Sequence, residues 1–561
     1  MPDVWSRELL EAARGQAPAD TVFRNALIFN PFVCGWEHGS LAVKNGLVLG
    51  IGNYTGRTEY DLRGLYIIPG LIDAHVHIES SLLAPREYAR MVVRYGTTTV
   101  IADPHEIANV AGTRGIDFML SQRDGAVIDI LYLLPSCVPA TPDDVGGAIL
   151  RARDLRQYAG RDGIRGLGEM MDVAGVLAAD PSILEKLQLC SVRDGHAPLL
   201  TGNDLNAYIL AGLQSDHECT RLDEAEEKLR RGMYIFIREG STEQNIAELI
   251  DLVTPDTVSR CCFATDDCHA DMLFERGHID RCVRRAVQCG LTPELALHMA
   301  TLSAAERFGL SDRGALTPGR RADFCVIDDP GSFRVRNVFV MGNEIVEPVQ
   351  VKQAPFLSPF PARGPSAGDI RLDGCGEARV IGLVPLQILT TSLRYTVTAE
   401  DIPDFGRDIL KVVICDRYHD AAYGVGLVHG FSLKRGAIAS SISHDAHNII
   451  AVGASDEEIL SAMNEVIRSR GAMVAVVGRS RAILPLDCGG LMSTLPYPDA
   501  VARLHDLRDE TEKMASISDP FMYLSFLALT VVPELRITTR GIFEVREFRN
   551  VPLFVDSSPQ E

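Results

Sequence analysis

Residues 64–78 read GLYIIPGLIDAHVHI, and this stretch decides the fold prediction. Its apolar run ends in His75-Val76-His77, and side chains two apart on a strand point to the same face. Both imidazoles can therefore converge on one metal ion. In a barrel of parallel strands, residues at the carboxyl ends of the strands face the catalytic mouth. Two structural histidines, satisfied by neighbouring groups, are the alternative for this motif taken alone.

An alternation of strand and helix patterns continues from this stretch to about residue 310. Such an order is typical of parallel βαβ units. We predict seven or eight units, which form an α/β fold of the (β/α)₈ TIM-barrel type over residues 69–312. Helical patterns include 83–95, 222–231 and 293–307. The further strand candidates are TTTVIAD (97–103), AVIDILYLLP (126–135), IRGLGEM (164–170), LQLCSV (187–192), MYIFIRE (233–239) and RCCFATDD (260–267).

Short strands with turn residues flank the barrel on both sides. Residues 1–68 predict a small β unit, in which Asn45-Gly46 is a hairpin signal. Residues 313–354 return to short strands, which can complete this unit as a β-sandwich by pairing across the sequence. A Pro/Gly-rich linker is predicted at 355–368, and a separate α+β domain at 369–561.

The composition favours a cytoplasmic protein with a small neutral ligand. The formal net charge of −20 disfavours nucleic acid and anionic membranes as partners. Thirteen cysteines without a C-x-x-C pair suit a reducing compartment and argue against a disulfide scaffold or a thiolate zinc site. The N-terminus lacks the features of a signal peptide, and no apolar segment reaches the length of a membrane span.

Metal-competent side chains recur at the predicted ends of successive strands. Each one alone has an ordinary alternative, because buried glutamates are usually ion-paired, lone histidines pack or lie exposed, and strand-end aspartates often cap helices. Six of them in order at one rim of a barrel favour a metal centre. The six are His75, His77, Glu169, His196, His217 and Asp266.

Competing motifs are incomplete. HEIAN begins like H-E-x-x-H but has Asn109 in place of the second histidine. GLGEMM lacks the third glycine of a dinucleotide fingerprint, and neither a P-loop nor the P-C-x-x-C of cytidine-deaminase zinc sites occurs.

The segments PGLIDAHVHIESS, DPHEIANVAG, GEMMD, DGHAPLLTGNDLNAYILAGLQSDHECT and TDDCHADML resemble the amidohydrolase superfamily and, within it, the adenine deaminases. The resemblance covers nearly the whole chain. It implies a hydrolase of purine salvage that converts adenine to hypoxanthine and ammonia at a binuclear metal centre. The implied ligands are His75, His77 and Asp266 for one metal, His196 and His217 for the other, and Glu169 as the bridge, where many relatives use a carboxylated lysine.

This ligand set fits hydrolytic deamination. Metal coordination lowers the pKa of water from about 15.7 to about 7, which supplies hydroxide for attack on C6. Asp266 is the natural group to take the proton of the attacking water and pass it to the departing ammonia. Imidazole and carboxylate ligands without thiolate suit manganese, iron(II) or zinc. The family resemblance favours two ions of manganese or iron(II).

Five further residues are candidates for contact with the purine. Asp103 and Glu106 can protonate N1 or hold the base, or they can cap a helix N-terminus. Asp267 follows the ligand aspartate, and a likeness to adenosine deaminases implies that it contacts N7. Glu79 and Ser80 can line the site, or they can belong to a loop and a helix start.

The C-terminal domain contains SISHDAHNIIAVG, which places His444, Asp445, His447 and Asn448 close together. This cluster can close the active site, build a subunit contact, or form a turn with a helix cap. We do not assign it to the metal. Two alternatives to adenine deamination stay open, namely an amidohydrolase acting on another aminopurine or cyclic amide, and a non-catalytic barrel scaffold. A homo-oligomer is expected, with a dimer favoured.

Overall fold

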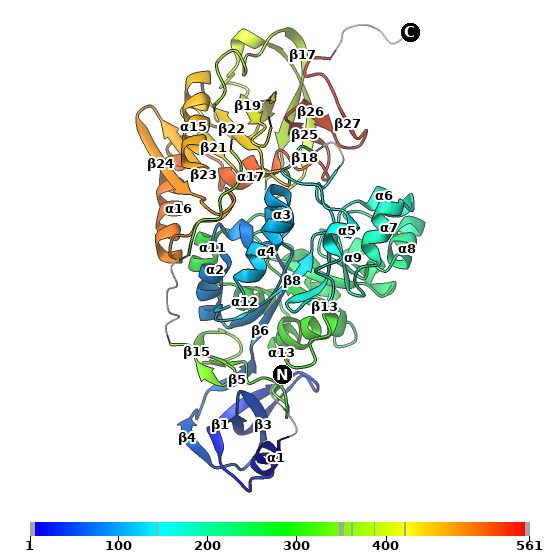
Figure 1. The fold of residues 1–561 in the computed structure, drawn as a ribbon, viewed down its shortest axis with the longest axis vertical. Helices are drawn as coiled ribbons and strands as arrows, with labels where there is room; N and C mark the ends of the chain where they lie inside the picture. Colours follow the sequence, from blue (N-terminus) through cyan, green and yellow to red (C-terminus); the bar gives the residue numbers. More distant parts are fainter. Residues whose placement is uncertain are drawn as a thin grey trace.

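Three units follow one another along the longest axis of the molecule (Figure 1). A β-sheet unit lies at one end, a TIM-like barrel in the middle and the C-terminal domain at the other end. The computed structural model describes residues 6–141, 144–346, 353–360, 363–385, 387–419 and 422–555. Parts of the predicted units therefore lie outside the described residues, at 1–5, 142–143, 347–352, 361–362, 386, 420–421 and 556–561.

The described part of the barrel contains eight parallel strands. Five are neighbours in the order β10-β9-β8-β7-β6, and three in the order β11-β12-β13. A parallel bridge between Val76 and Asp266 joins β6 to β13, so the first and last strands are adjacent. The strands are β6 (Leu71–Val76), β7 (Thr97–Ala102), β8 (Asp129–Leu134), β9 (Ile164–Met170), β10 (Arg193–Gly195), β11 (Ser215–Asp216), β12 (Tyr234–Arg238) and β13 (Cys261–Ala264).

The prediction of a strand at LQLCSV (187–192) is wrong. Leu187 ends helix α7 (Pro181–Leu187), and strand β10 begins only at Arg193. The carboxylate of Asp180 accepts from the N–H groups of Ser182 and Ile183, and Pro181 stands at the first helical position. These signals favour a helix that starts at Pro181, and this helix takes up Leu187, the first residue of the segment.

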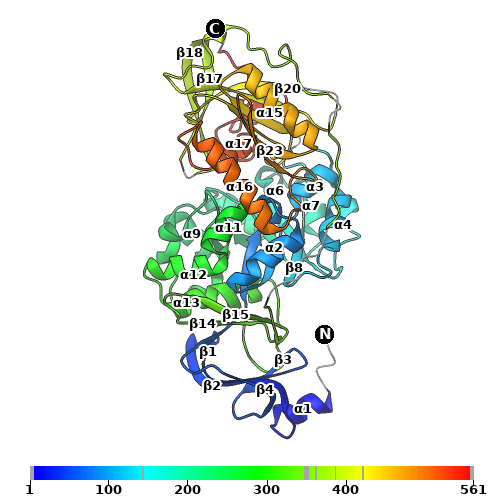
Figure 2. The same cartoon turned by 90° about the vertical axis from the view of Figure 1, so that its left-hand side faces the viewer.

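Helices surround the barrel strands (Figures 1 and 2). The predicted helix at 222–231 is confirmed as α9, and the one at 293–307 is confirmed as α13 and α14 joined by a π-helical turn at Met299–Ser303. The other helices are α2 (Pro85–Val92), α3 (His105–Ala111), α4 (Thr113–Ser121), α5 (Ala152–Leu155), α6 (Val173–Leu177), α8 (Gly202–Leu210), α10 (Ile246–Leu249), α11 (Ala270–Arg276) and α12 (Ile279–Gln288), while α9 spans Leu222–Arg230, α13 Pro293–His298 and α14 Ala304–Arg307.

One eight-stranded sheet holds residues from both flanks of the barrel. Strand β5 pairs with β1 on one side and with β14 on the other, so the two flanks join there. Asn45 and Gly46, with φ of 52° and 76°, form the turn between β2 and β3, as predicted. The elements are α1 (Arg7–Ala13), β1 (Ala19–Asn30), β2 (Gly35–Lys44), β3 (Leu47–Ile51), β4 (Gly56–Asp61), β5 (Tyr66–Pro69), β14 (Phe324–Ile327), β15 (Val335–Val340) and β16 (Asn343–Glu344).

The C-terminal domain has an eight-stranded sheet in the order β18-β17-β20-β19-β22-β21-β23-β24, and a three-stranded sheet β25-β26-β27. Helix α15 packs on the larger sheet through Ile459, Met463 and Val466. The elements are β17 (Cys375–Leu383), β18 (Thr390–Thr398), β19 (Ile409–Cys415), β20 (Tyr423–His429), β21 (Ala437–Ser440), β22 (Ile449–Gly453), α15 (Asp456–Ser469), β23 (Ala472–Val477), β24 (Ser480–Pro485), α16 (Tyr497–Glu512), α17 (Pro520–Phe526), β25 (Leu535–Thr538), β26 (Gly541–Glu544) and β27 (Arg549–Asn550).

Two helices of the C-terminal domain lie on its barrel side. Helix α16 reaches from the domain to α2 and α11 (Figure 2), and α17 packs near strands β21 and β22 on the barrel side. The domain therefore stands over the strand ends that carry the predicted ligands. Among the described helices, none combines the length and apolar character that crossing a bilayer requires.

Candidate metal centre

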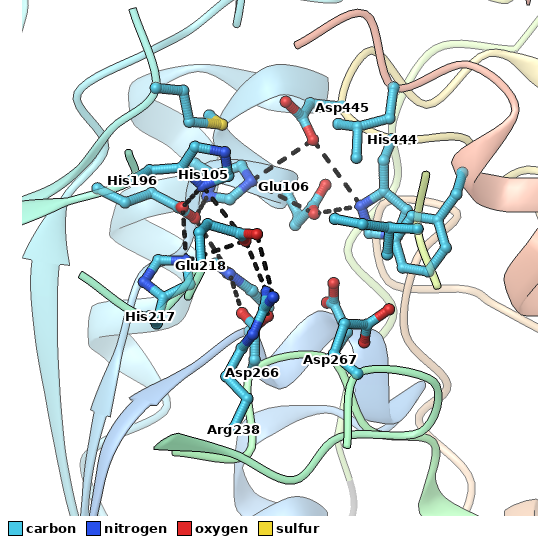
Figure 3. Close-up of a pocket in the computed structure, with 17 residues that line it drawn as sticks. His105, Glu106, His196, His217, Glu218, Arg238, Asp266, Asp267, His444 and Asp445 are labelled. Atoms are coloured by element: carbon cyan, nitrogen blue, oxygen red, sulfur yellow. Dashed lines mark hydrogen bonds and ion pairs between the residues drawn. The ribbon is translucent and has the colours of Figure 1, made fainter. Parts of the chain in front are cut away.

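The six predicted ligands meet at one end of the barrel, at or just beyond the ends of their strands. Figure 3 labels three of them, His196, His217 and Asp266. Nε2 of His77 lies 3.2 Å from Oε1 of Glu169 and 3.2 Å from Oδ1 of Asp266. The other oxygen of Glu169, Oε2, lies 2.7 Å from Nδ1 of His196 and 3.1 Å from Nε2 of His217. Glu169 thus turns one oxygen toward each of two groups of nitrogen ligands.

The hydrogen bonds of His75 and His77 test whether this arrangement fits a cation. Nδ1 of His75 donates to Oδ2 of Asp194 at 2.8 Å, and Nδ1 of His77 donates to the carbonyl oxygen of Asp103 at 3.1 Å. In the neutral imidazoles that bind metal, these bonds place the proton on Nδ1 and leave a lone pair on each Nε2. The two Nε2 atoms lie only 3.2 Å apart. Facing lone pairs repel, and a shared cation removes the repulsion, so the donor set fits a metal.

Asp103 supports the cluster from behind. Its Oδ2 accepts from the backbone N–H of Glu169 at 2.9 Å. A Cβ atom on Gly168 would lie 2.0 Å from this oxygen, so glycine is required for the close approach. The carboxylate of Asp103 therefore fixes the end of β9 and is absent from the wall of the cavity described below.

Glu79 and Ser80 lie beside the cluster in different roles. Oε1 of Glu79 accepts from the backbone N–H of Ile107 in the first turn of α3, at 3.2 Å, and burial raises the pKa of Glu79 to about 7. Oγ of Ser80 donates to Oδ1 of Asp267. Burial also raises the pKa of Asp267, whose carboxyl group lines the cavity. The cap position of α3 is Pro104, without a side-chain hydrogen bond, so neither Asp103 nor Glu106 caps this helix.

Sequence reasoning missed a buried arginine in the cluster. Nη1 of Arg238 donates to Oε1 of Glu218 at 2.6 Å and to Oδ2 of Asp266 at 2.9 Å, and Nη2 donates to Oε2 of Glu218 at 3.0 Å. Arg238 is the last residue of β12 and the penultimate residue of the predicted strand MYIFIRE, and Glu218 directly follows the candidate ligand His217. The rule that found the ligands, a polar residue at a strand end, would also have found Arg238.

The C-terminal cluster closes the site from above, which was one of its three predicted roles. Nδ1 of His444 donates to Oε1 of Glu106 at 2.6 Å, and Nε2 of His447 contacts Oε2. Burial alone would raise the pKa of Glu106, but His444, His447 and His105 hold it well below its usual range. Burial lowers the pKa of His444, yet the carboxylates of Glu106 and Asp267 outweigh it and raise the pKa to about 9.

Candidate ligands and residues of the C-terminal domain line one cavity of about 40 Å³, which we call the metal cavity. Nearly all of its wall is buried, and Ile388 is the partly buried exception. Figure 3 shows that side chains from the barrel and from the C-terminal domain point into it. The wall is formed by His77, His105, Glu106, Glu169, Met171, His196, His217, Glu218, Arg238, Glu243, Asp266, Asp267, Ile388, His444, Asp445, Phe526 and Leu529.

Comparisons with known proteins agree with this architecture. The amidohydrolase family matches residues 66–345, and the adenine deaminase C-terminal domain matches residues 387–549. An adenine deaminase of Methanoregula boonei is 60% identical over 548 residues, which are 97% of this chain and 98% of that protein. An adenine deaminase of Dehalococcoides mccartyi is 42% identical over 562 residues, 97% of this chain and 98% of that protein.

A solved structure of N-acetyl-D-glucosamine-6-phosphate deacetylase from Mycobacterium smegmatis is similar to part of this chain. The match covers 58% of this chain and 100% of that chain, with a TM-score of 0.46 and 18% identity. The barrel and its cluster of imidazole and carboxylate groups define an amidohydrolase, a class that implies the use of divalent metal. Within this class, the chain belongs to the adenine deaminase family. The resemblance found in the sequence is confirmed.

Proposed function

We propose that the chain hydrolyses adenine to hypoxanthine and ammonia. The observation that carries the proposal is the position of Glu169, whose two carboxylate oxygens each face a different group of histidine nitrogens in an enclosed cavity. This arrangement suits two cations sharing one carboxylate. Adenine is proposed as the substrate because relatives that are 60% and 42% identical over 97% of the chain are named adenine deaminase.

The donor atoms suggest which residues hold which metal. We assign His75, His77 and Asp266 to one divalent ion and His196 and His217 to the other, with Glu169 between them. Imidazole nitrogen and carboxylate oxygen suit manganese or iron(II), and also zinc. When bound, the ions supply hydroxide at neutral pH, because they lower the pKa of water from about 15.7 to about 7.

Asp266 is assigned to proton transfer. Its Oδ2 is held by Arg238 at 2.9 Å, while its Oδ1 faces the Nε2 atoms of His75 and His77 at 3.5 and 3.2 Å. Oδ1 is therefore the oxygen that meets the attacking water. In the reaction, water oxygen bonds to C6 and the bond from C6 to the amino nitrogen breaks. One proton of the water reaches N1, and the other leaves with the amine as ammonia.

Glu106 and His444 form the pair assigned to N1. Glu106 is ionised, and the pKa of about 9 at His444 keeps that imidazole protonated at neutral pH. The 2.6 Å hydrogen bond places a proton between them, and both groups line the cavity. This pair can hand a proton to N1, and the proton that the attacking water releases then replaces it.

Asp267 is assigned to the far side of the purine. Its carboxyl group lines the cavity and accepts from Ser80. Burial raises the pKa of Asp267 and so favours the protonated form of its carboxyl group, the form that can donate to N7. Ser80 fixes the orientation of this carboxyl group.

We also propose that the eight parallel strands close into one (β/α)₈ barrel over residues 69–312. The bridge between Val76 and Asp266 supports closure. We further propose that the flanking sheet folds as a β-sandwich from residues 1–68 and 313–354. Two separate apolar clusters on this sheet, one with Phe23 and Phe324 and one with Val22 and Leu49, support that proposal.

The test is turnover of adenine by protein loaded with manganese or iron(II), followed by ultraviolet absorbance and ammonia release. Asp266→Asn should lower kcat about 10²–10⁴-fold, because general acid–base transfer is lost. Asp373→Asn, at an exposed position, should leave kcat unchanged. If the protein hydrolyses another aminopurine or a cyclic amide but not adenine, that compound replaces adenine as the proposed substrate. A protein that binds no metal and turns over none of them would be the non-catalytic scaffold.

A further inference from the structure

A larger cavity lies between the barrel and the C-terminal domain. Its volume is about 570 Å³, and small-molecule sites typically measure about 300–1,000 Å³. The barrel contributes residues after β12 and from both ends of α11, and the C-terminal domain contributes β23, α16, α17 and the segment between the two helices. We call it the interdomain cavity. Thr242, His269, Met473, Arg508, Ser516 and Phe521 are among its lining residues.

The interdomain cavity and the metal cavity share one wall. Glu243 and Asp267 line the metal cavity, whereas Thr242 and His269 line the interdomain cavity. The backbone N–H of Ser241 donates to the carbonyl oxygen of Asp267 at 2.9 Å, and the N–H of His269 donates to Oγ of Ser241 at 3.0 Å. Two short bonded segments therefore separate the hollows.

A third, very small cavity of about 10 Å³ lies between the other two. It shares His269, Met473 and Phe521 with the interdomain cavity, and it shares His444 with the metal cavity. We call it the throat. The three hollows thus form a row that ends at the metal ligands.

The metal cavity needs such a connection. At about 40 Å³ it is far smaller than a typical small-molecule site. A purine base must therefore enter through a wall that yields. The throat is lined partly by Met473, an unbranched and flexible side chain, and by the planar ring of Phe521.

The lining of the interdomain cavity suits a neutral heterocycle. Arg508 is paired with Glu275 at 3.1 Å and also with Asp271, and Nδ1 of His269 lies 3.4 Å from Oδ2 of Asp519. The wall holds four carboxylates and two guanidinium groups, an acidic balance that disfavours an anionic ligand. The rest of the surface combines apolar side chains with hydroxyl, amide and further charged groups, which can meet the flat faces and the polar edge of a purine.

We propose that the interdomain cavity is the first binding site of the purine base, and that the base passes through the throat to the metal centre. The identity of this ligand rests on the proposed function. The competing entrance is at Ile388, the partly buried residue in the wall of the metal cavity, beside the exposed Leu389.

The experiment blocks each entrance in turn. Ser516 is exposed and lines the interdomain cavity, and Leu389 stands at the other entrance. Ser516→Cys and Leu389→Cys are made in a Cys375→Ser background, because Cys375 is the exposed cysteine of the described residues. The metal-loaded proteins are modified with a bulky methanethiosulfonate label. A thiol reductant then removes the label. Unchanged thermal unfolding shows that the label leaves the fold intact.

Two measurements test the access path and the identity of the substrate independently. We expect the label at Ser516→Cys to lower kcat/KM for adenine about tenfold or more, because hindered access slows association, and the reductant to restore it. The same label should slow removal of the metal by 1,10-phenanthroline, a planar chelator. The label at Leu389→Cys should change neither kcat/KM for adenine nor the rate at which phenanthroline removes the metal. The proposed path would be wrong if the label at Ser516→Cys changed neither kcat/KM nor the rate of metal removal. It would also be wrong if only the label at Leu389→Cys lowered them. Failure of the unlabelled protein to deaminate adenine would instead refute the proposed function, while phenanthroline still reports the path.

Discussion

Nδ1 of His444 in the C-terminal domain donates a 2.6 Å hydrogen bond to Oε1 of Glu106, which lies 338 positions earlier at the start of α3. Both side chains are buried and line the metal cavity. The second domain therefore contributes polar groups to the active site in addition to covering it. Chemistry at this site depends on how the two domains dock.

The first prediction concerns His444. His444→Gln keeps a hydrogen-bond donor near Glu106 but cannot carry a proton, so kcat for adenine should fall about 10²-fold or more. KM should change little if the imidazole acts mainly in proton transfer. Steady-state kinetics on the metal-loaded variant measures both constants. His38→Gln, at an exposed position, is the matched control. A variant with normal kcat would remove His444 from the reaction.

The second prediction concerns Arg238, which is 2% exposed and bonded to both Glu218 and Asp266. Arg238→Met leaves two buried carboxylates without their cation, and removal of one partner from a buried ion pair costs about 3–5 kcal/mol. We expect a lower urea midpoint of unfolding and a large loss of kcat. Arg221→Met removes an exposed pair with Asp223 and should leave the midpoint unchanged. Equal stability of the two variants would contradict this account of Arg238.

The sequence was sufficient to predict that the six candidate ligands lie together, because their signal is local. His75, His77 and Asp266 lie at or just beyond the end of an apolar strand, and parallel strands bring such ends to one rim. His196 and His217 join the cluster although their strands were not predicted correctly. Strand β10 has three residues and β11 two, and both are too short to show a period of hydrophobicity.

Contacts between the domains were beyond the reach of sequence patterns. The bond from His444 to Glu106 depends on the docking of a separate sheet, which no local periodicity encodes. The orientation of Asp103 also depends on a residue that is distant in the sequence. Its motif suggested a contact with substrate, but the absence of a side chain at Gly168 lets its carboxylate turn toward the backbone of Glu169.

The third prediction concerns removal of the metal. The lone pairs of His75 and His77 face each other at 3.2 Å, so a cation should stabilise the folded chain specifically. A ligand at a hundredfold excess over its Kd adds about 2.7 kcal/mol to the free energy of unfolding. Dialysis against a chelator should therefore lower the thermal midpoint, and added manganese or iron(II) should restore it. His77→Ala should lose this response. A wild-type midpoint that ignores the chelator would contradict metal binding at these histidines.

The last prediction concerns pH and Asp144, which accepts from Oγ1 of Thr530 in the C-terminal domain at 2.8 and 3.0 Å. Burial raises the pKa of Asp144 to about 7, whereas an unfolded aspartate titrates near about 3.9. Between these values the unfolded chain releases its proton and the folded chain keeps it. The contribution of Asp144 to stability is therefore full below pH 4, falls as the pH rises to about 7, and is level above.

Asp144→Asn keeps an oxygen acceptor for Thr530 and cannot ionise, so it should escape this loss. The thermal midpoint of the variant minus that of the wild type should grow between pH 4.5 and 7 and then stay constant, because only the wild type releases a proton on unfolding. Scans at pH 4.5, 6, 7 and 8 measure the difference, and Asp251→Asn at an exposed position should show none. A difference that is flat with pH would mean that Asp144 is already ionised in the folded protein, and that its bonds to Thr530 are those of a carboxylate.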